Sequence, residues 1–155
     1  VARANRGWMD GFNIDFEPEN GDTPTVTDAM SFASFLDQFA RALHAEGFNL
    51  TVDIANWSPL FIDSLLAQTQ VDRFITMSTY TVNISRFEEI VKDKLEAYGT
   101  RKAGIGMETL AKFTGADAKA RLDAVRTAGI DTVGIWMTPL PDGWIAPIKA
   151  FVNDP

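Results

Sequence analysis

The chain of 155 residues is 46% hydrophobic and 23% charged, which is typical of one globular domain. Its formal net charge of −7 argues against nucleic acid and anionic membranes as partners, because surfaces of the same sign repel. It contains no cysteine, which excludes disulfides and thiolate chemistry, and we expect no metal and no cofactor. No apolar run reaches the roughly 18 residues of a membrane span.

Short apolar segments alternate with segments of helical periodicity along the whole chain. The apolar segments predict strands at 8–17, 48–55, 73–81, 102–109 and 131–137. The spacing of apolar residues between them predicts helices at 28–46, 59–68, 84–98, 117–128 and 144–152. Three of these helices should end at a glycine: Gly47, Gly99 and Gly129. The single histidine, His44, falls in a predicted helix and is interpreted as a surface residue.

The regular order of strand and helix predicts parallel strands joined by helical crossovers. Two α/β architectures fit this order: an open, doubly wound sheet and a piece of a (β/α)8 TIM barrel. Length alone favours the open sheet, because a barrel typically needs about 250 residues. No repeat or linker divides the chain, so residues 1–155 are assigned to one domain.

The strand ends favour the barrel. The predicted strands end in residues with functional chemistry, namely Glu17, Trp57, Tyr80, Glu108 and Trp136. One face of the second predicted strand carries Thr51, Asp53 and Ala55, whereas the other face is apolar. A sheet covered by helices on both sides should be apolar on both faces. The pattern therefore indicates a barrel whose inner face leads to a site at the carboxyl ends of its strands.

Residues 10–17, Asp-Gly-Phe-Asn-Ile-Asp-Phe-Glu, carry the strongest functional signal. In a strand, Asn13, Asp15 and Glu17 share one face, and the apolar residues between them share the other. Two close carboxylates resist ionising together, so one of them can keep its proton. A carboxyl that donates a proton beside a stabilising carboxylate is the chemistry of glycosidic bond cleavage.

This octapeptide resembles the Asp-x-x-Asp-x-Asp-x-Glu signature of the family-eighteen glycoside hydrolases, the chitinase-like barrels. Asn13 stands at the second acidic position, as in the di-N-acetylchitobiase branch. Residues 51–59 resemble the fifth barrel strand of that branch, 77–80 loosely resemble the sixth, and 133–136 are similar to the eighth. The resemblance implies that the chain covers roughly strands 4 to 8, the C-terminal portion of a single barrel domain.

The resemblance also implies a function, the retaining, substrate-assisted hydrolysis of β-1,4-linked N-acetylglucosamine. Glu17 would be the general acid and base, and Asp15 would bind the acetamido N–H of the substrate. Asp10 and Asn13 would orient Asp15. The remaining expected roles belong to the later strands: Tyr80 on the acetamido oxygen, Trp136 under the sugar ring, and Trp57 and Glu108 lining subsites.

One departure leaves a second interpretation open. The family usually has an acidic or amide residue after the sixth-strand tyrosine, where this chain has Thr81. A catalytically silent lectin of the chitinase-like type is therefore an alternative, although such lectins usually lose the glutamate that Glu17 retains. A non-carbohydrate α/β binding domain would make the octapeptide a coincidence.

The resemblance leaves the first three barrel strands unaccounted for. Part of a barrel has unpaired strand edges and lacks pocket walls. We therefore expect these residues alone to be unstable or inactive, and a preceding segment of about 100 residues to complete a monomer. The expected partner is a carbohydrate substrate, and the family favours an extracellular or lysosome-like location.

Overall fold

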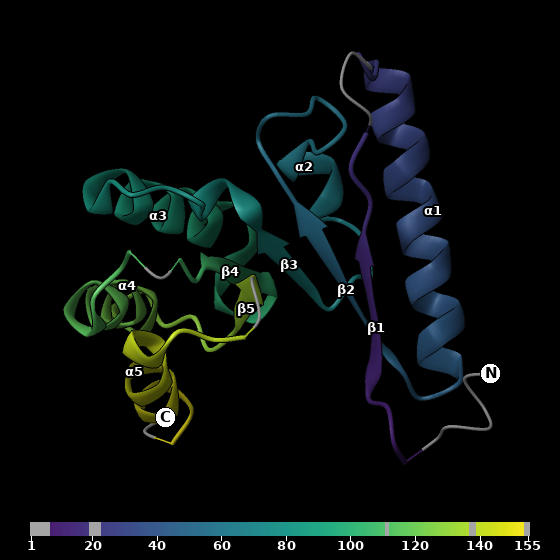
Figure 1. Cartoon of the computed structure of the whole chain (residues 1–155). Coiled ribbons are helices and arrows are strands. Elements are labelled where there is room, and N and C mark those ends of the chain that lie inside the picture. Colours follow the sequence, from purple (N-terminus) through teal and green to yellow (C-terminus); the bar gives the residue numbers. More distant parts are fainter. Residues whose placement is uncertain (1–6, 19–22, 111, 137–138, 154–155) are drawn as a thin grey trace. The chain divides into compact units, whose positions relative to one another are not determined.

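A computed structural model describes residues 7–18, 23–110, 112–136 and 139–153 (Figure 1). The chain divides into two compact units, Val1–Ile75 and Thr76–Pro155. Each unit has its own strands and helices. Among the described residues, no helix is both long and apolar enough to cross a membrane.

The first unit contains β1 (Gly11–Asp15), α1 (Val26–Ala45), β2 (Asn49–Ile54), α2 (Asp63–Leu66) and β3 (Arg73–Thr76), whose last residue begins the second unit. β1 and β2 are parallel, as predicted for strands joined by a helix. Helix α1 packs against β2. Its buried residues recur every three or four positions and are Ala29, Ala33, Leu36, Ala40 and Leu43. This spacing places them on one side of the helix, where they form a core with the apolar face of β2.

The ends of α1 follow from local chemistry. The hydroxyl of Thr25 accepts a hydrogen bond from the amide of Asp28, and the carboxylate of Asp28 accepts one from the amide of Thr25. This capping box begins the helix two residues before the predicted start. At the other end Gly47 has φ of +78°, a conformation that glycine adopts without strain, and it ends the helix as predicted.

His44 lies on the surface of the first unit. Its Nε2 is 2.8 Å from Oδ2 of Asp72, and the same oxygen accepts a hydrogen bond from the amide of Leu50. The histidine therefore ties the end of α1 to the segment before β3. This agrees with its interpretation as a surface residue.

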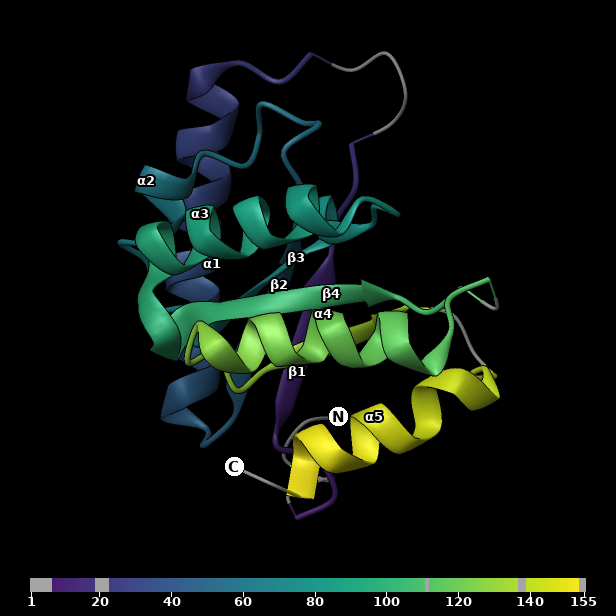
Figure 2. The ribbon, with the colours of Figure 1, turned by 90° about the vertical axis from the view of Figure 1, so that its left-hand side faces the viewer.

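The second unit contains a short 3-10 helix η2 (Met77–Thr79), α3 (Ile84–Lys102), β4 (Ala103–Glu108), α4 (Gly115–Thr127), β5 (Val133–Trp136) and α5 (Asp142–Asn153). β4 and β5 are parallel neighbours. Helix α4 packs against both α3 and α5 (Figure 2). Trp144 of α5 is fully buried, and its ring meets that of Phe113 edge to face. This aromatic pair anchors α5 to the segment before α4.

The third predicted strand, 73–81, is wrong at its carboxyl end. β3 stops at Thr76, and the chain then turns through η2. The hydroxyl of Thr76 accepts from the amide of Ser78, and the hydroxyl of Thr79 donates back to the carbonyl of Thr76. These local bonds compete with continued strand pairing, which the alternation of residue types cannot reveal.

The boundaries of the other strands and helices differ from the predicted ones by a few residues, except for one helix. The helix predicted at 59–68 is reduced to α2, Asp63–Leu66, and no side chain caps its start. Gly99 has φ of +66° and interrupts α3 at the predicted place, although a further helical turn follows it. Gly129, with φ of +72°, follows the end of α4 as predicted.

Candidate active site

The octapeptide occupies β1 and the residues on either side of it. The register pairs Asn13 with Thr51 and Asp15 with Asp53. Because partners across a parallel pair point to the same face, these four side chains form one polar surface. Phe12 lies on the opposite face, where its ring meets that of Phe48. The predicted separation of a polar and an apolar face is therefore present along β1.

Asn13 connects the polar side chains of β1 and β2 by hydrogen bonds. The hydroxyl of Thr51 donates to Oδ1 of Asn13 over 2.6 Å, and Nδ2 of Asn13 donates to Oδ2 of Asp53 over 2.7 Å. The resemblance to family eighteen implies that Asn13 orients Asp15. The side-chain hydrogen bonds that the structure gives Asn13 go to β2 instead, because the strand register brings Thr51 and Asp53 to either side of it.

Asp53 has the most perturbed environment on this surface. Burial raises its pKa, the hydrogen bond from Asn13 lowers it, and the charges of Asp15 and Glu17 raise it further. The charges of Asp15 and Glu17 therefore act on Asp53 at the carboxyl ends of β1 and β2. Asp53 lies on the predicted inner face of its strand but is not among the site residues predicted from the sequence. The signal that could have found it is the polar alternation of Thr51 and Asp53, which matches that of Asn13 and Asp15.

The other predicted site residues of the first unit lie around this surface. Asp10 precedes β1, and its carbonyl accepts a hydrogen bond from the amide of Asn49. Glu17 follows β1, is exposed, and lines a surface groove of about 600 Å³ together with Phe16 and Leu60. Trp57 follows β2 and is 55% exposed. Both Glu17 and Trp57 thus lie beyond the carboxyl ends of their strands. For Glu17 this differs from the predicted strand 8–17, because β1 already ends at Asp15.

The second unit brings two more predicted residues to the carboxyl ends of its strands. Glu108 is the last residue of β4 and is the register partner of Trp136, the last residue of β5. The amide and hydroxyl of Thr109 both donate to the carbonyl of Trp136, whose side chain is 52% exposed. An exposed indole on a firmly held backbone is a suitable platform for a sugar ring.

Tyr80 follows η2 and lies against β4. A Cβ added to Gly106 would be 2.9 Å from Cε1 of the Tyr80 ring and 2.6 Å from the carbonyl oxygen of Thr76. Only glycine therefore leaves room for the ring at this place in β4. Gly106 thus accommodates the tyrosine.

Thr81 stands where the resemblance of the sequence to family eighteen leads us to expect an acidic or amide residue. Its hydroxyl accepts a hydrogen bond from the amide of Asn83 over 3.2 Å. Its side chain therefore stabilises the turn that leads into α3.

Among the described residues, no group of three or more histidine, aspartate or glutamate side chains could hold a metal ion.

No protein-family model and no curated protein matches the chain. Solved structures do match it. A chitinase from Chromobacterium violaceum aligns with a TM-score of 0.77 at 14% identity, over 99% of this chain and 70% of the chitinase. A class V chitinase from Pseudomonas fluorescens aligns with a TM-score of 0.75 at 14% identity, over 97% of this chain and 69% of that protein.

The fold is that of a partial (β/α)8 barrel. The barrel interpretation is therefore confirmed over the open, doubly wound sheet, and the chain covers roughly strands 4 to 8 of such a barrel. In this fold, active sites lie at the carboxyl ends of the strands. At or beyond those ends lie Asp15, Glu17 and Trp57 in the first unit, and Glu108 and Trp136 in the second. Asp10 instead precedes β1, Asn13 lies within it, and Tyr80 follows η2.

Proposed function

We propose that the chain carries the catalytic residues of a glycoside hydrolase that cleaves β-1,4 linkages of N-acetylglucosamine. The observation that carries this proposal is the carboxylate surface at the end of β1, in a fold shared with two chitinases. The octapeptide at this position resembles the family-eighteen signature. Asn13 remains our reason to suggest the di-N-acetylchitobiase branch within that family.

The carboxylates of the first unit have separate roles in this proposal. Glu17, which is exposed beside a groove, protonates the leaving oxygen and later removes a proton from the incoming water. Asp15 binds the acetamido N–H of the substrate and stabilises the positive charge that develops on the sugar. Asp10 supports Asp15 at the start of the strand. Asn13 and Asp53 form a hydrogen-bonded pair beside Asp15 that limits its side-chain freedom.

The residues of the second unit bind the substrate. Tyr80 donates a hydrogen bond to the acetamido oxygen, which then attacks the anomeric carbon in place of a protein carboxylate. Such substrate assistance is a known exception to the scheme with two catalytic carboxylates. Trp136 supports the sugar ring, while Trp57 and Glu108 line neighbouring subsites. The reaction retains the configuration of the anomeric carbon because it involves two successive displacements.

The first test compares the protein that carries this chain with its Glu17→Gln variant on a fluorogenic N-acetylchitobioside. Glutamine keeps the shape of the side chain but cannot supply a proton, so we expect kcat to fall by about 10²- to 10⁴-fold. The matched control is Glu88→Gln, the same substitution at an exposed position of α3. Equal turnover in the wild type and Glu17→Gln would contradict the assignment of Glu17.

The rival function is a lectin that binds N-acetylglucosamine oligomers without cleaving them. The observation that favours it is Thr81, whose side chain contributes to a turn rather than supplying a carboxylate or amide. Binding of chito-oligosaccharides by calorimetry, with no turnover in the wild type, would select the lectin.

We further propose that residues 1–155 are the C-terminal portion of one barrel domain and that a preceding segment completes it. This proposal is supported by the unmatched 30% of the chitinase's length, because the match covers 70% of that protein. The completed domain is expected to be a monomer with a carbohydrate as its partner.

A further inference from the structure

Arg121 of α4 is a buried cation in the second unit. The residue is only 4% exposed. Its guanidinium carbon lies 4.3 Å from the ring centroid of Phe113 and 5.6 Å from that of Phe87, so two aromatic rings flank the charge. Burial lowers the pKa of this guanidinium and the charge of Asp117 raises it, yet an arginine stays protonated in such surroundings. A charge at this depth needs hydrogen-bond partners to offset its desolvation.

The partners of Arg121 are backbone carbonyls next to Tyr80. Its Nη2 donates to the carbonyl oxygens of Thr81 and Val82, each over 3.0 Å. Its Nη1 donates to the carbonyl oxygen of Asp117, over 3.3 Å, within its own helix. The planar guanidinium therefore joins α4 to the two residues that directly follow the tyrosine. This is a use to which arginine is better suited than lysine, because its donors are fixed in one plane.

The chain is also held on the other side of Tyr80. The hydroxyl of Thr79 donates to the carbonyl oxygen of Gly106 over 2.7 Å and to that of Thr76 over 2.8 Å. The tyrosine ring then lies where a Cβ on Gly106 would collide with it. The segment that carries Tyr80 is thus fixed to β4 before the tyrosine and to α4 after it.

We propose that Arg121 is a positioning residue, which holds the backbone after Tyr80 so that the phenol points at the acetamido group of the substrate. The inference rests on the proposed function for the role of Tyr80, although its structural part stands without it. It also gives Thr81 a function: its carbonyl oxygen is a point of attachment for Arg121, while its hydroxyl stabilises the turn.

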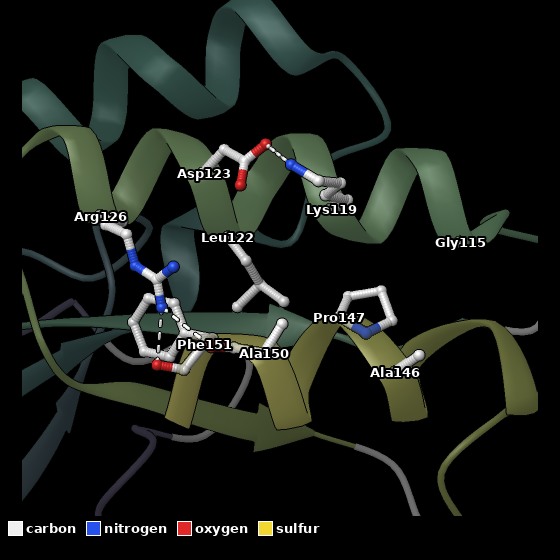
Figure 3. A pocket seen from close by; sticks show the side chains of 9 residues that line it. All are labelled: Gly115, Lys119, Leu122, Asp123, Arg126, Ala146, Pro147, Ala150 and Phe151. Carbon is white, nitrogen blue, oxygen red and sulfur yellow. Dashed lines mark hydrogen bonds and ion pairs between the residues drawn. The ribbon is translucent and has the colours of Figure 1, made fainter. Parts of the chain in front are cut away.

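Arg126 provides a matched control on the same helix. It lines a pocket of about 360 Å³ together with residues of α5 (Figure 3). Its Nη2 donates to the carbonyls of Ala150 and Phe151, and its guanidinium lies 5.2 Å from the Phe151 ring centroid. Arg126 therefore makes the same kinds of contact as Arg121, but with the last helix instead of the segment after Tyr80.

The first experiment observes Tyr80 directly and needs no activity. The chain has two tyrosines, so 3-fluorotyrosine labelling gives a fluorine NMR signal for Tyr80 and one for Tyr98, assigned with Tyr80→Phe. Arg121→Met should shift or broaden the Tyr80 signal and leave the Tyr98 signal in place. Arg126→Met should leave both unchanged. An unchanged Tyr80 signal in a folded Arg121→Met protein would overturn the inference.

The second experiment measures hydrolysis of the fluorogenic N-acetylchitobioside. Arg121→Met should lower kcat by about tenfold to a hundredfold, the loss expected when a reacting group is misplaced by about 1 Å. Arg121→Lys keeps the charge but not the planar donors, and we expect it to restore part of kcat. Because Arg121 acts through Tyr80, adding Arg121→Met to Tyr80→Phe should cause less than a twofold further loss. Losses that multiply in the double variant would overturn the inference.

The two experiments separate failure of the inference from failure of the proposed function. A Tyr80 signal that responds to Arg121→Met in a protein without turnover supports the positioning role and contradicts the hydrolase. If Arg121→Met does not fold, Arg121→Lys in the fluorine experiment takes its place. A Tyr80 signal that is unchanged in this variant, together with unchanged kcat, overturns the inference.

Discussion

At the scale of single residues, Asp53 shows how a neighbouring strand changes the properties of a site. Its carboxyl group accepts a hydrogen bond from Asn13 and lies near the charges of Asp15 and Glu17. The proposed catalytic strand therefore does not act alone. The second strand supplies both a hydrogen-bond partner and an additional titratable group.

The raised pKa of Asp53 predicts a pH-dependent stability. The folded state favours the protonated form, so this group's contribution to stability is fully present below the unfolded value of about 3.9 and is lost as pH rises through the folded pKa. Asp53→Asn stays neutral and keeps an oxygen that accepts from Asn13. We therefore expect its free energy of unfolding, relative to the wild type, to increase as pH rises from 3 to 7 in urea denaturation.

Asp28 provides a control, because the effect of pH on its contribution to stability has the opposite sign. Hydrogen bonds from Thr25 lower the pKa of Asp28, so the stability that Asp28 contributes is present above its unfolded pKa and lost in acid. Asp28→Asn should therefore lose stability relative to the wild type as pH rises. Parallel pH profiles for Asp53→Asn and Asp28→Asn would contradict the assignment of these shifts.

At the scale of elements, Tyr80 depends on the shape of β4 and on the turn that ends β3. The strand offers a glycine where the ring lies, and η2 directs the chain out of the sheet before the tyrosine. The side chain is therefore aimed by the backbone around it as well as by its own rotamer.

Gly106→Ala tests this arrangement. The new Cβ would lie 2.6 Å from the carbonyl oxygen of Thr76 and 2.9 Å from the Tyr80 ring, so the turn must shift. We expect the substitution to cost about 1–3 kcal/mol of stability, as overpacking typically does. At a temperature where the variant is folded, we expect kcat for the fluorogenic substrate to fall at least tenfold.

Gly115→Ala is the matched control, because it lies at the start of α4 and its Cβ would be in ordinary contact with the carbonyl of Gly143. It should be neutral or stabilise the protein by about 0.5–1 kcal/mol, since alanine is the better helix former. Full activity and stability in Gly106→Ala would show that the Tyr80 ring does not lie against this strand.

At the scale of the whole molecule, the outer edges of β1 and β5 limit the stability of residues 1–155 alone. In the part of the chain that the structure describes, β1 pairs with β2 on one side, and β5 pairs with β4 on one side. Free strand edges are sites of unwanted pairing. The polar surface of β1 is exposed in the same part of the chain, with Asn13 and Asp15 both accessible.

We therefore expect a protein of residues 1–155 alone to unfold without a single cooperative transition in calorimetry, or to associate in analytical ultracentrifugation. A longer protein with the preceding segment of about 100 residues should melt cooperatively as a monomer. A sharp, monomeric melt of residues 1–155 alone would contradict the proposal that they are part of a larger domain.

Local order in the sequence was enough to predict the order of strands and helices, the glycines that end or interrupt three helices, and the placement of Glu17, Tyr80, Glu108 and Trp136 at or beyond strand ends. It did not predict that β3 ends at Thr76 or that α2 is only Asp63–Leu66. These features depend on residues close together in the chain. The choice of a barrel needed the polar inner face of the strands and the resemblance of the octapeptide, and the solved chitinases confirm it as a fold.

Only the tertiary structure decided which distant residues hold the site together. Asn13 bonds Asp53 and Arg121 bonds Thr81, and each pair is separated by 40 positions in the chain. Nothing in the local pattern distinguishes Arg121 from Arg126, which lie in the same predicted helix. Their partners follow from strand register and helix packing, which arise when separate segments bury their apolar faces together. The sequence by itself thus determined the elements and the chemistry at their ends, whereas tertiary packing decided which side chains support that chemistry.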